Sequence, residues 1–114
     1  MSFEPSPIFV KIYDLLAWLI PITLQFPKSQ RFVLAKRLQD AALDVHEALI
    51  AAGKTQRAER RRHLLEANIR LEQVRLHWRL CRTLNLVEPG RYEHGARLID
   101  AIGRLLGGWI ASGG

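Results

Sequence analysis

Apolar residues recur every three or four positions along most of the chain, which is the spacing of amphipathic helices. The pattern predicts four helices, over about residues 7–25, 29–52, 55–84 and 91–112. No segment shows the strict alternation of apolar and polar residues that is typical of a half-buried strand. The connections between the predicted helices are short, which favours antiparallel neighbours. The sequence therefore predicts an all-α protein, an antiparallel up-down four-helix bundle.

Residues with strong local preferences mark the predicted helix ends. Ser29 and Thr55 are predicted N-caps of the second and third helices, because a hydroxyl oxygen there accepts a hydrogen bond from a first-turn N–H group. Gly53 is predicted to take the left-handed position just past the end of the second helix. Pro21 has no N–H to donate to the carbonyl of Ala17, so it should kink or end the first helix.

The third predicted helix carries more apolar residues than one buried face needs. On a helical wheel they form two stripes on roughly opposite sides. The first stripe is Leu64, Ala67, Leu71, Val74, Trp78 and Cys81, and the second stripe is Leu65, Ile69, Leu76 and Leu80. A peripheral helix of a monomeric bundle needs only one stripe, and a second one left in water would be an unusually large apolar patch. We expect the second stripe to form a subunit interface in a homo-oligomer; the alternative is that other helices of the same chain cover it.

Three glycines, Gly95, Gly103 and Gly107, lie along one ridge of the fourth predicted helix. An interior glycine costs about 1 kcal/mol relative to alanine, so a packing contact should offset that cost. We expect near contact between two helix backbones along this ridge. The alternative is that Gly107 marks a fraying helix end.

The positive charge of the chain is concentrated in the third predicted helix. Residues 54–82 hold nine basic and three acidic side chains, a difference of +6 that equals the net charge of the whole chain. A local excess of this kind indicates an anionic partner, and the alternative is a well-solvated helix surface. We predict contacts to nucleic-acid phosphates or to a polymerase partner for Arg57, Arg61, Arg75, Arg79 and Arg82, and weaker ones for Lys54, Arg60 and Arg62. The alternative is that some of these cations pair with Asp40, Asp44 or Glu47 of the second helix.

No arrangement of residues indicates catalysis, a cofactor or a metal site. At 114 residues the chain makes one domain, residues 1–114. His77 and Cys81 are one helical turn apart, but no further cluster supplies the other ligands that zinc needs. Because Cys81 is the only cysteine, no disulfide forms within the chain, and the reducing cytoplasm is the expected location. The most apolar run, 15–24, is about half the ~20 residues of a membrane span, so no membrane contact is expected.

Sequence-specific recognition of nucleic acid is not indicated either. The chain has no zinc-finger spacing, no RNP-like aromatic strand and no recognition helix after a tight turn. Trp18, Trp78 and Trp109 fall within the apolar pattern and are predicted to lie in the core. Phosphate contact without base readout predicts an affinity that falls steeply with salt.

Two segments, "FPKSQRFVLAKRLQDAAL" and "YEHGARLIDAIGRLLGGWI", together with the arginine-rich third helix, resemble the accessory variability determinant (Avd) of diversity-generating retroelements. Avd belongs to a wider family of four-helix-bundle proteins that includes the ribosomal-RNA intervening-sequence proteins. The resemblance covers residues 9–110.

The resemblance implies a homopentameric, barrel-like assembly with a basic surface. It also implies binding to the retroelement reverse transcriptase and to template-repeat RNA or DNA, in support of mutagenic cDNA synthesis and retrohoming. Two other interpretations stay open at this point. One is an oligomeric interaction module whose basic face binds an acidic protein, and the other is an intervening-sequence relative that has no polymerase partner.

Overall fold

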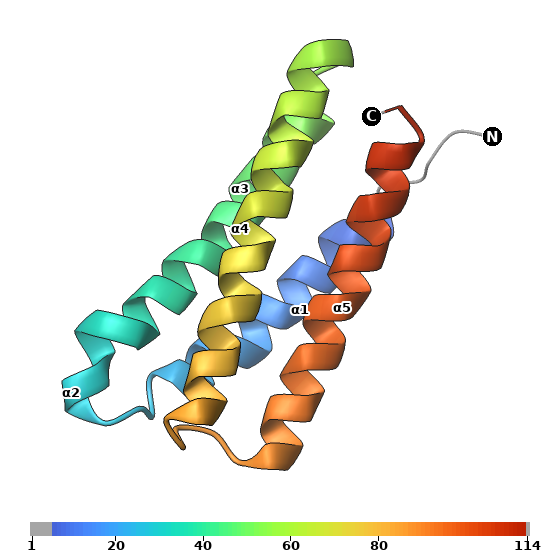
Figure 1. The fold of residues 1–114 in the computed structure, drawn as a ribbon. Coiled ribbons are helices and arrows are strands. Elements are labelled where there is room, and N and C mark those ends of the chain that lie inside the picture. The colour runs from blue at the N-terminus through green and yellow to red at the C-terminus, as the bar shows by residue number, and fades with distance from the viewer. Residues whose placement is uncertain (1–5, 114) are drawn as a thin grey trace.

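The computed structural model describes residues 6–113, nearly all of which are helical (Figure 1). A short helix α2 (Lys28–Gln30) and a π-helical turn η1 (Arg31–Ala35) lead directly into α3. The four long helices are α1 (Ser6–Thr23), α3 (Lys36–Gly53), α4 (Arg57–Thr83) and α5 (Pro89–Ala111). The described residues contain no strand. The predicted all-α class with four main helices is confirmed.

Each long helix packs against two others around one apolar core. α3 and α5 both contact α1 and α4, so α1 and α4 lie at opposite corners of the bundle. All six residues of the first stripe of α4 are buried, as the wheel predicts. Trp78 and Trp109 are buried and Trp18 packs against the core, so the predicted place of the tryptophans is confirmed. The α3–α4 hairpin reaches beyond α1 and α5 and forms one end of the 45 Å long molecule (Figure 1).

Most helix ends lie within about two residues of the predicted ones, but the predicted second helix, 29–52, is divided into α2, η1 and α3, and α3 begins only at Lys36. The predicted caps are wrong. Ser29 lies inside α2, and the N-cap of α4 is Gln56 rather than Thr55. Thr55 instead closes the end of α3, because its Oγ1 donates a hydrogen bond to the carbonyl of Ala51 at 2.8 Å. Gly53 is the last residue of α3 and has no positive φ. The hydroxyl of Thr55 therefore donates to backbone carbonyls at the end of α3 and does not cap the N–H groups at the start of α4.

The first helix continues through Pro21 and ends two residues later. Its last residue, Thr23, is buried, and its Oγ1 donates a hydrogen bond to the carbonyl of Ile20 at 2.7 Å. The same hydroxyl oxygen accepts a hydrogen bond from Nε2 of Gln39 at 2.8 Å. These two bonds satisfy the buried hydroxyl and fix the end of α1 against α3.

Gly95 and Gly103 of α5 make room for side chains of α4, so the predicted contact between two helix backbones is not formed within the subunit. A Cβ atom on Gly95 would lie 2.6 Å from the indole of Trp78, far inside van der Waals contact. A Cβ on Gly103 would lie 3.2 Å from Nη2 of Arg75, and one on Gly107 would meet nothing within 4 Å. Gly107 is nevertheless inside α5, which continues to Ala111.

Replacing Gly95 with alanine should lower the free energy of unfolding by about 1–3 kcal/mol, because the new methyl group overlaps a buried indole. Gly107→Ala is the matched control in the same helix. Its methyl group meets open space, so it should raise the free energy of unfolding by up to about 1 kcal/mol through helix propensity. Urea denaturation of the two variants measures both effects, and a decrease of equal size in both would show that the Trp78 contact is not what requires glycine.

Candidate nucleic-acid interface

Four cations crowd together at the end of the α3–α4 hairpin. Lys54 lies in the turn, and Arg57, Arg61 and Arg62 lie in the first two turns of α4; all four are exposed. Within residues 6–113 none of the four forms an ion pair. Glu59 is the only acidic side chain between positions 54 and 65. Like charges held this close repel one another, so the hairpin end favours an anion that neutralises them.

The backbone at the hairpin end is strained at Arg57, whose φ is 58°. Asn85, in the connection after α4, has the same φ, but asparagine tolerates this left-handed region. For a side chain such as arginine the same conformation costs roughly 1–2 kcal/mol. Strain of this kind collects at functional positions. A fold optimised for stability alone would place asparagine or glycine at this position.

Arg60 differs from its neighbours because it is used inside the fold. Its Nε donates a hydrogen bond to the carbonyl of Ala52 at 2.9 Å, which satisfies one of the last carbonyls of α3. Its guanidinium carbon lies 6.0 Å from the ring centroid of Trp109 on α5, within cation–π range. Arg60 therefore fastens the hairpin end to α3 and α5, which explains why it is only half exposed.

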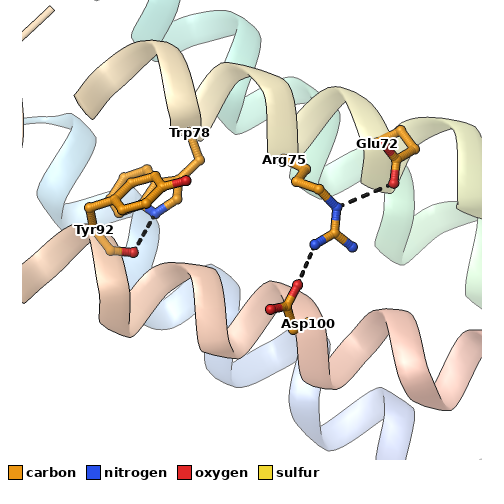
Figure 2. A network of polar contacts seen from close by, with 5 residues as sticks. All are labelled: Glu72, Arg75, Trp78, Tyr92 and Asp100. Carbon is orange, nitrogen blue, oxygen red and sulfur yellow. Dashed lines mark hydrogen bonds and ion pairs between the residues drawn. The ribbon is translucent and has the colours of Figure 1, made fainter. Parts of the chain in front are cut away.

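Arg75 joins α4 to α5 (Figure 2). Its guanidinium forms ion pairs with Glu72 on its own helix, at 3.2 Å, and with Asp100 on α5. Burial by itself lowers the pKa of Arg75, but the hydrogen bonds and charges of Asp100 and Glu72 outweigh it and leave the pKa raised. Two carboxylates thus compensate this charge within the subunit. Of the predicted phosphate contacts, Arg75 has the least net charge to offer a ligand.

The same view shows how the aromatic residues set the spacing of α4 and α5 next to this ion pair (Figure 2). The indole Nε1 of Trp78 donates a hydrogen bond to the carbonyl of Tyr92 at 3.0 Å. The Tyr92 ring stacks on the indole with ring centroids 6.1 Å apart and an angle of 14° between planes. Together with Arg75, these residues line a groove of about 230 Å³ between the two helices, into which Arg79 also faces.

The two remaining predicted arginines lie toward the other end of α4. Arg79 is exposed and forms no ion pair among residues 6–113, so its charge is uncompensated. Arg82 is half exposed, and its Nη1 donates a hydrogen bond to Oδ1 of Asn85 at 3.2 Å. A cation in this last turn also interacts favourably with the helix dipole. Arg82 therefore has a structural use that Arg79 lacks.

The acidic residues of the second predicted helix do not pair with the predicted cations. Asp40 pairs with Lys36 at 2.8 Å, and Asp44 lies 4.0 Å from Arg70. Glu47 forms no ion pair within the described part of the chain. The partner of Arg75, Asp100, comes instead from α5, and the sequence pattern did not predict it.

The second stripe of α4 is not covered by the chain's own helices. Leu65, Ile69, Leu76 and Leu80 are between 39% and 57% exposed. This rules out the alternative in which other helices of the same subunit bury the stripe. Its use as a subunit interface stays a prediction.

A further exposed apolar surface, which was not predicted from the sequence, lies on α1 and α3. Val10 and Tyr13 project from α1, Leu24 lies directly after the end of α1, and Leu43 and Ile50 project from α3. A shallow apolar groove between the two helices is lined by Tyr13, Leu16, Ala17, Ile20, Pro21, Leu43 and His46. The helical spacing of Val10, Tyr13, Ala17, Pro21 and Leu24 is the sequence signal that could have shown it. Because α1 lies diagonally opposite α4, the two apolar surfaces face different directions.

A comparison with known protein families shows which family the chain belongs to. It matches the family described as bAvd-like over residues 8–113. The chain belongs to the bAvd-like family. The resemblance to Avd is therefore confirmed, and this is an Avd-type accessory protein. No curated protein matches the chain closely enough to count as a relative. None of the helices of this Avd-type protein within residues 6–113 has the length and apolar character to cross a membrane.

Substitutions at Arg75 and Arg79 of this Avd-type protein should differ in their effect on stability, because Arg75 joins two helices and Arg79 forms no ion pair within residues 6–113. Arg75→Met keeps the apolar stem but removes the ion pair between α4 and α5, so it should lower the free energy of unfolding by about 0.5–1 kcal/mol at low salt. Arg79→Met removes an unpaired charge and should stay within about 0.5 kcal/mol of the wild type. Urea denaturation measures both, and equal stability of the two variants would contradict a structural role for Arg75.

Proposed function

We propose that this Avd-type protein binds the RNA or DNA of a diversity-generating retroelement together with the element's reverse transcriptase. It thereby supports mutagenic cDNA synthesis and retrohoming, while the chemistry belongs to the polymerase. One observation carries the nucleic-acid part: the exposed, unpaired cations Lys54, Arg57, Arg61 and Arg62 at the hairpin end. Membership in the bAvd-like family supports the retroelement and polymerase part.

The guanidinium groups suit phosphate. Each is planar and permanently charged, and it pairs with phosphate through two parallel hydrogen bonds. Arg57, Arg61 and Arg62 are the main contacts in this proposal, Lys54 adds a point charge, and Arg79 extends the surface along α4. Arg60, Arg75 and Arg82 mainly hold the fold. No phenylalanine, tyrosine or tryptophan lies among residues 54–65, so this end contacts the sugar–phosphate backbone and positions the strand without reading its sequence.

We also propose that the subunits assemble as a ring. The second stripe of α4 and the apolar surface of α1 and α3 differ in composition and lie on different sides of the subunit. Packing one surface against the other on the next subunit is a head-to-tail contact, which closes into a ring when the rotation allows it. The resemblance to Avd implies five subunits. A ring repeats the basic hairpin end around one axis and strengthens its field for a polyanion.

The cytoplasm remains the proposed location, although Cys81 gives it less support than the sequence suggested. The thiol is buried in the core, and burial raises its pKa to about 12. At neutral pH it is therefore protonated and unreactive. A thiol in this state persists in any compartment.

Binding should weaken steeply with salt, with a slope of log affinity against log salt of about −0.9 per neutralised phosphate on duplex. The variant Arg61→Gln with Arg62→Gln should bind more weakly, and its slope should be shallower by about one for each phosphate that it no longer neutralises. The matched control is Arg91→Gln with Arg104→Gln, which removes two exposed, unpaired charges from α5. Fluorescence anisotropy with labelled retroelement RNA at several salt concentrations measures affinity and slope.

Two outcomes would redirect this proposal. Equally weakened binding in the control and in the hairpin variant would show that general charge, and not the hairpin end, drives binding. A wild-type protein that binds the co-expressed reverse transcriptase but has no affinity for RNA or DNA at low salt would favour the interaction module with an acidic protein partner.

The ring predicts a specific result when two assembly-deficient variants are mixed. Ile69→Glu with Leu76→Glu should abolish assembly through the α4 stripe, and Tyr13→Glu with Leu43→Glu should abolish it through the opposite surface. Because each variant keeps the surface that the other lacks, the mixture should form dimers and nothing larger. Light scattering measures the masses. If the Tyr13 and Leu43 variant assembles normally by itself, the contact pairs two α4 stripes and the ring is wrong.

A further inference from the structure

Phe32 is the most exposed large apolar side chain among the described residues, with 81% of its surface accessible. It lies on the π-helical turn η1, where the N–H group of Lys36 bonds to the carbonyl of Arg31 five residues earlier. The extra residue in this turn lets Leu34 and Ala35 enter the core while Phe32 points to solvent. π-Helical turns inside helices frequently mark functional sites. Because most of the phenyl ring is exposed, its burial contributes little to the stability of the subunit.

The Phe32 ring borders a groove of about 610 Å³ between α3 and α4. Two acidic side chains in the groove are already paired: Asp40 with Lys36 at 2.8 Å and Asp44 with Arg70 at 4.0 Å. Arg37 also lines the groove, is exposed, and forms no ion pair within residues 6–113. The groove therefore combines an aromatic face with one uncompensated positive charge.

The wall of the groove formed by α4 includes the polar side chains of His77 and Gln73. The Nδ1 atom of His77 is itself buried, so it is not accessible to a ligand in the groove, and it has no hydrogen-bond partner among the described residues. Burial and the nearby charge of Arg37 lower the pKa of His77, so its imidazole is neutral at pH 7 and has both a donor and an acceptor nitrogen. Gln73, one helical turn before, adds an amide to the same wall.

We propose that this groove holds one unpaired base of a single-stranded nucleic acid, stacked on Phe32, with an adjacent phosphate on Arg37. The proposal rests on the function proposed above and narrows it to single strands, because a base inside a duplex has no free face for stacking. Aromatic platforms bordered by cations are the usual means of binding single strands. Interfaces between copies of one chain are more apolar than the rest of the surface, whereas most side chains lining this groove are charged or polar. A protein partner is therefore kept as an outcome of the test.

Leu76 connects the groove to the second stripe, because it belongs to both. In the proposed ring, the bound base would lie beside the contact between subunits. The assembled protein is therefore the right sample for the test.

The test compares a fluorescein-labelled oligothymidine with a duplex of the same length, using the full chain. Phe32→Leu removes the ring but keeps an apolar side chain, and it should weaken single-strand binding by about five- to a hundredfold, the range of base–aromatic stacking. Duplex affinity should stay within about twofold, because phosphate contacts dominate there. Phe32→Trp should bind single strands like the wild type. Val33→Ala, which trims the exposed neighbour on the same turn, is the matched control and should also bind like the wild type.

Photocrosslinking with 5-iodouracil in the strand gives a second measurement that does not depend on affinity. The crosslinked peptide, identified by mass spectrometry, should contain Phe32. A crosslink confined to other residues would overturn the proposal.

The outcomes also separate this proposal from the one before it. If Arg61→Gln with Arg62→Gln weakens binding to both ligands while Phe32→Leu weakens neither, the stacking site is wrong and the proposed function stands. If Phe32→Leu changes the solution mass or the capture of the reverse transcriptase but not the affinity for oligothymidine, the ring serves a protein contact and the stacking site is wrong. If the wild-type protein binds neither ligand, the proposed function fails, and the stacking site fails with it.

Discussion

The fold depends on the burial of the Trp78 indole between α4, α5 and α1. The indole fills the space that Gly95 leaves open, donates its N–H to a carbonyl of α5, and meets the edge of Trp18 from α1. A large side chain gains most from burial when its polar atom is satisfied and its neighbours fit its shape. Because Trp78 belongs to the first stripe of α4, its burial leaves the second stripe, on the opposite face, outside. The place of this outer stripe and of the arginines next to it follows from that burial.

The arginines of α4 divide into two groups by what they meet. Arg60 and Arg75 cross to neighbouring helices, where a carbonyl, an indole face and two carboxylates use their charge. Arg57, Arg61 and Arg62 are exposed and form no ion pair within residues 6–113. The contacts of each side chain thus separate cations that stabilise the fold from cations available to a ligand. Strain at Arg57 belongs to the second group, where stability is not the governing requirement.

Several apolar surfaces of the subunit stay exposed. The outer stripe of α4, the surface on α1 and α3, and Phe32 all remain in water in a single subunit. Soluble monomers rarely leave several such patches open. Their separation on different sides of the bundle is what a head-to-tail assembly uses. Phe32 borders a groove in which most lining side chains are charged or polar, and this groove also includes Leu76 of the outer stripe.

The helices, the buried stripe and the second, uncovered stripe of α4 could all be predicted from the order of residues. These features depend on a period of 3.6 residues, which is a local property of the chain. Most helix ends were predicted within about two residues, but Ser29, Gly53 and Thr55 had other roles, because caps depend on hydrogen bonds that the residue type alone does not fix.

Every basic residue of the candidate site on α4 and in the turn before it was predicted from the residue order, and the contacts of these residues to a ligand stay predictions. Arg75 could not be told from Arg79 in this way, since the partner Asp100 lies 25 positions away and comes close only when α5 packs on α4. Packing likewise decided that Gly95 and Gly103 of α5 receive side chains and that the π-helical turn leaves Phe32 in solvent, because both depend on how the helices fit together in space.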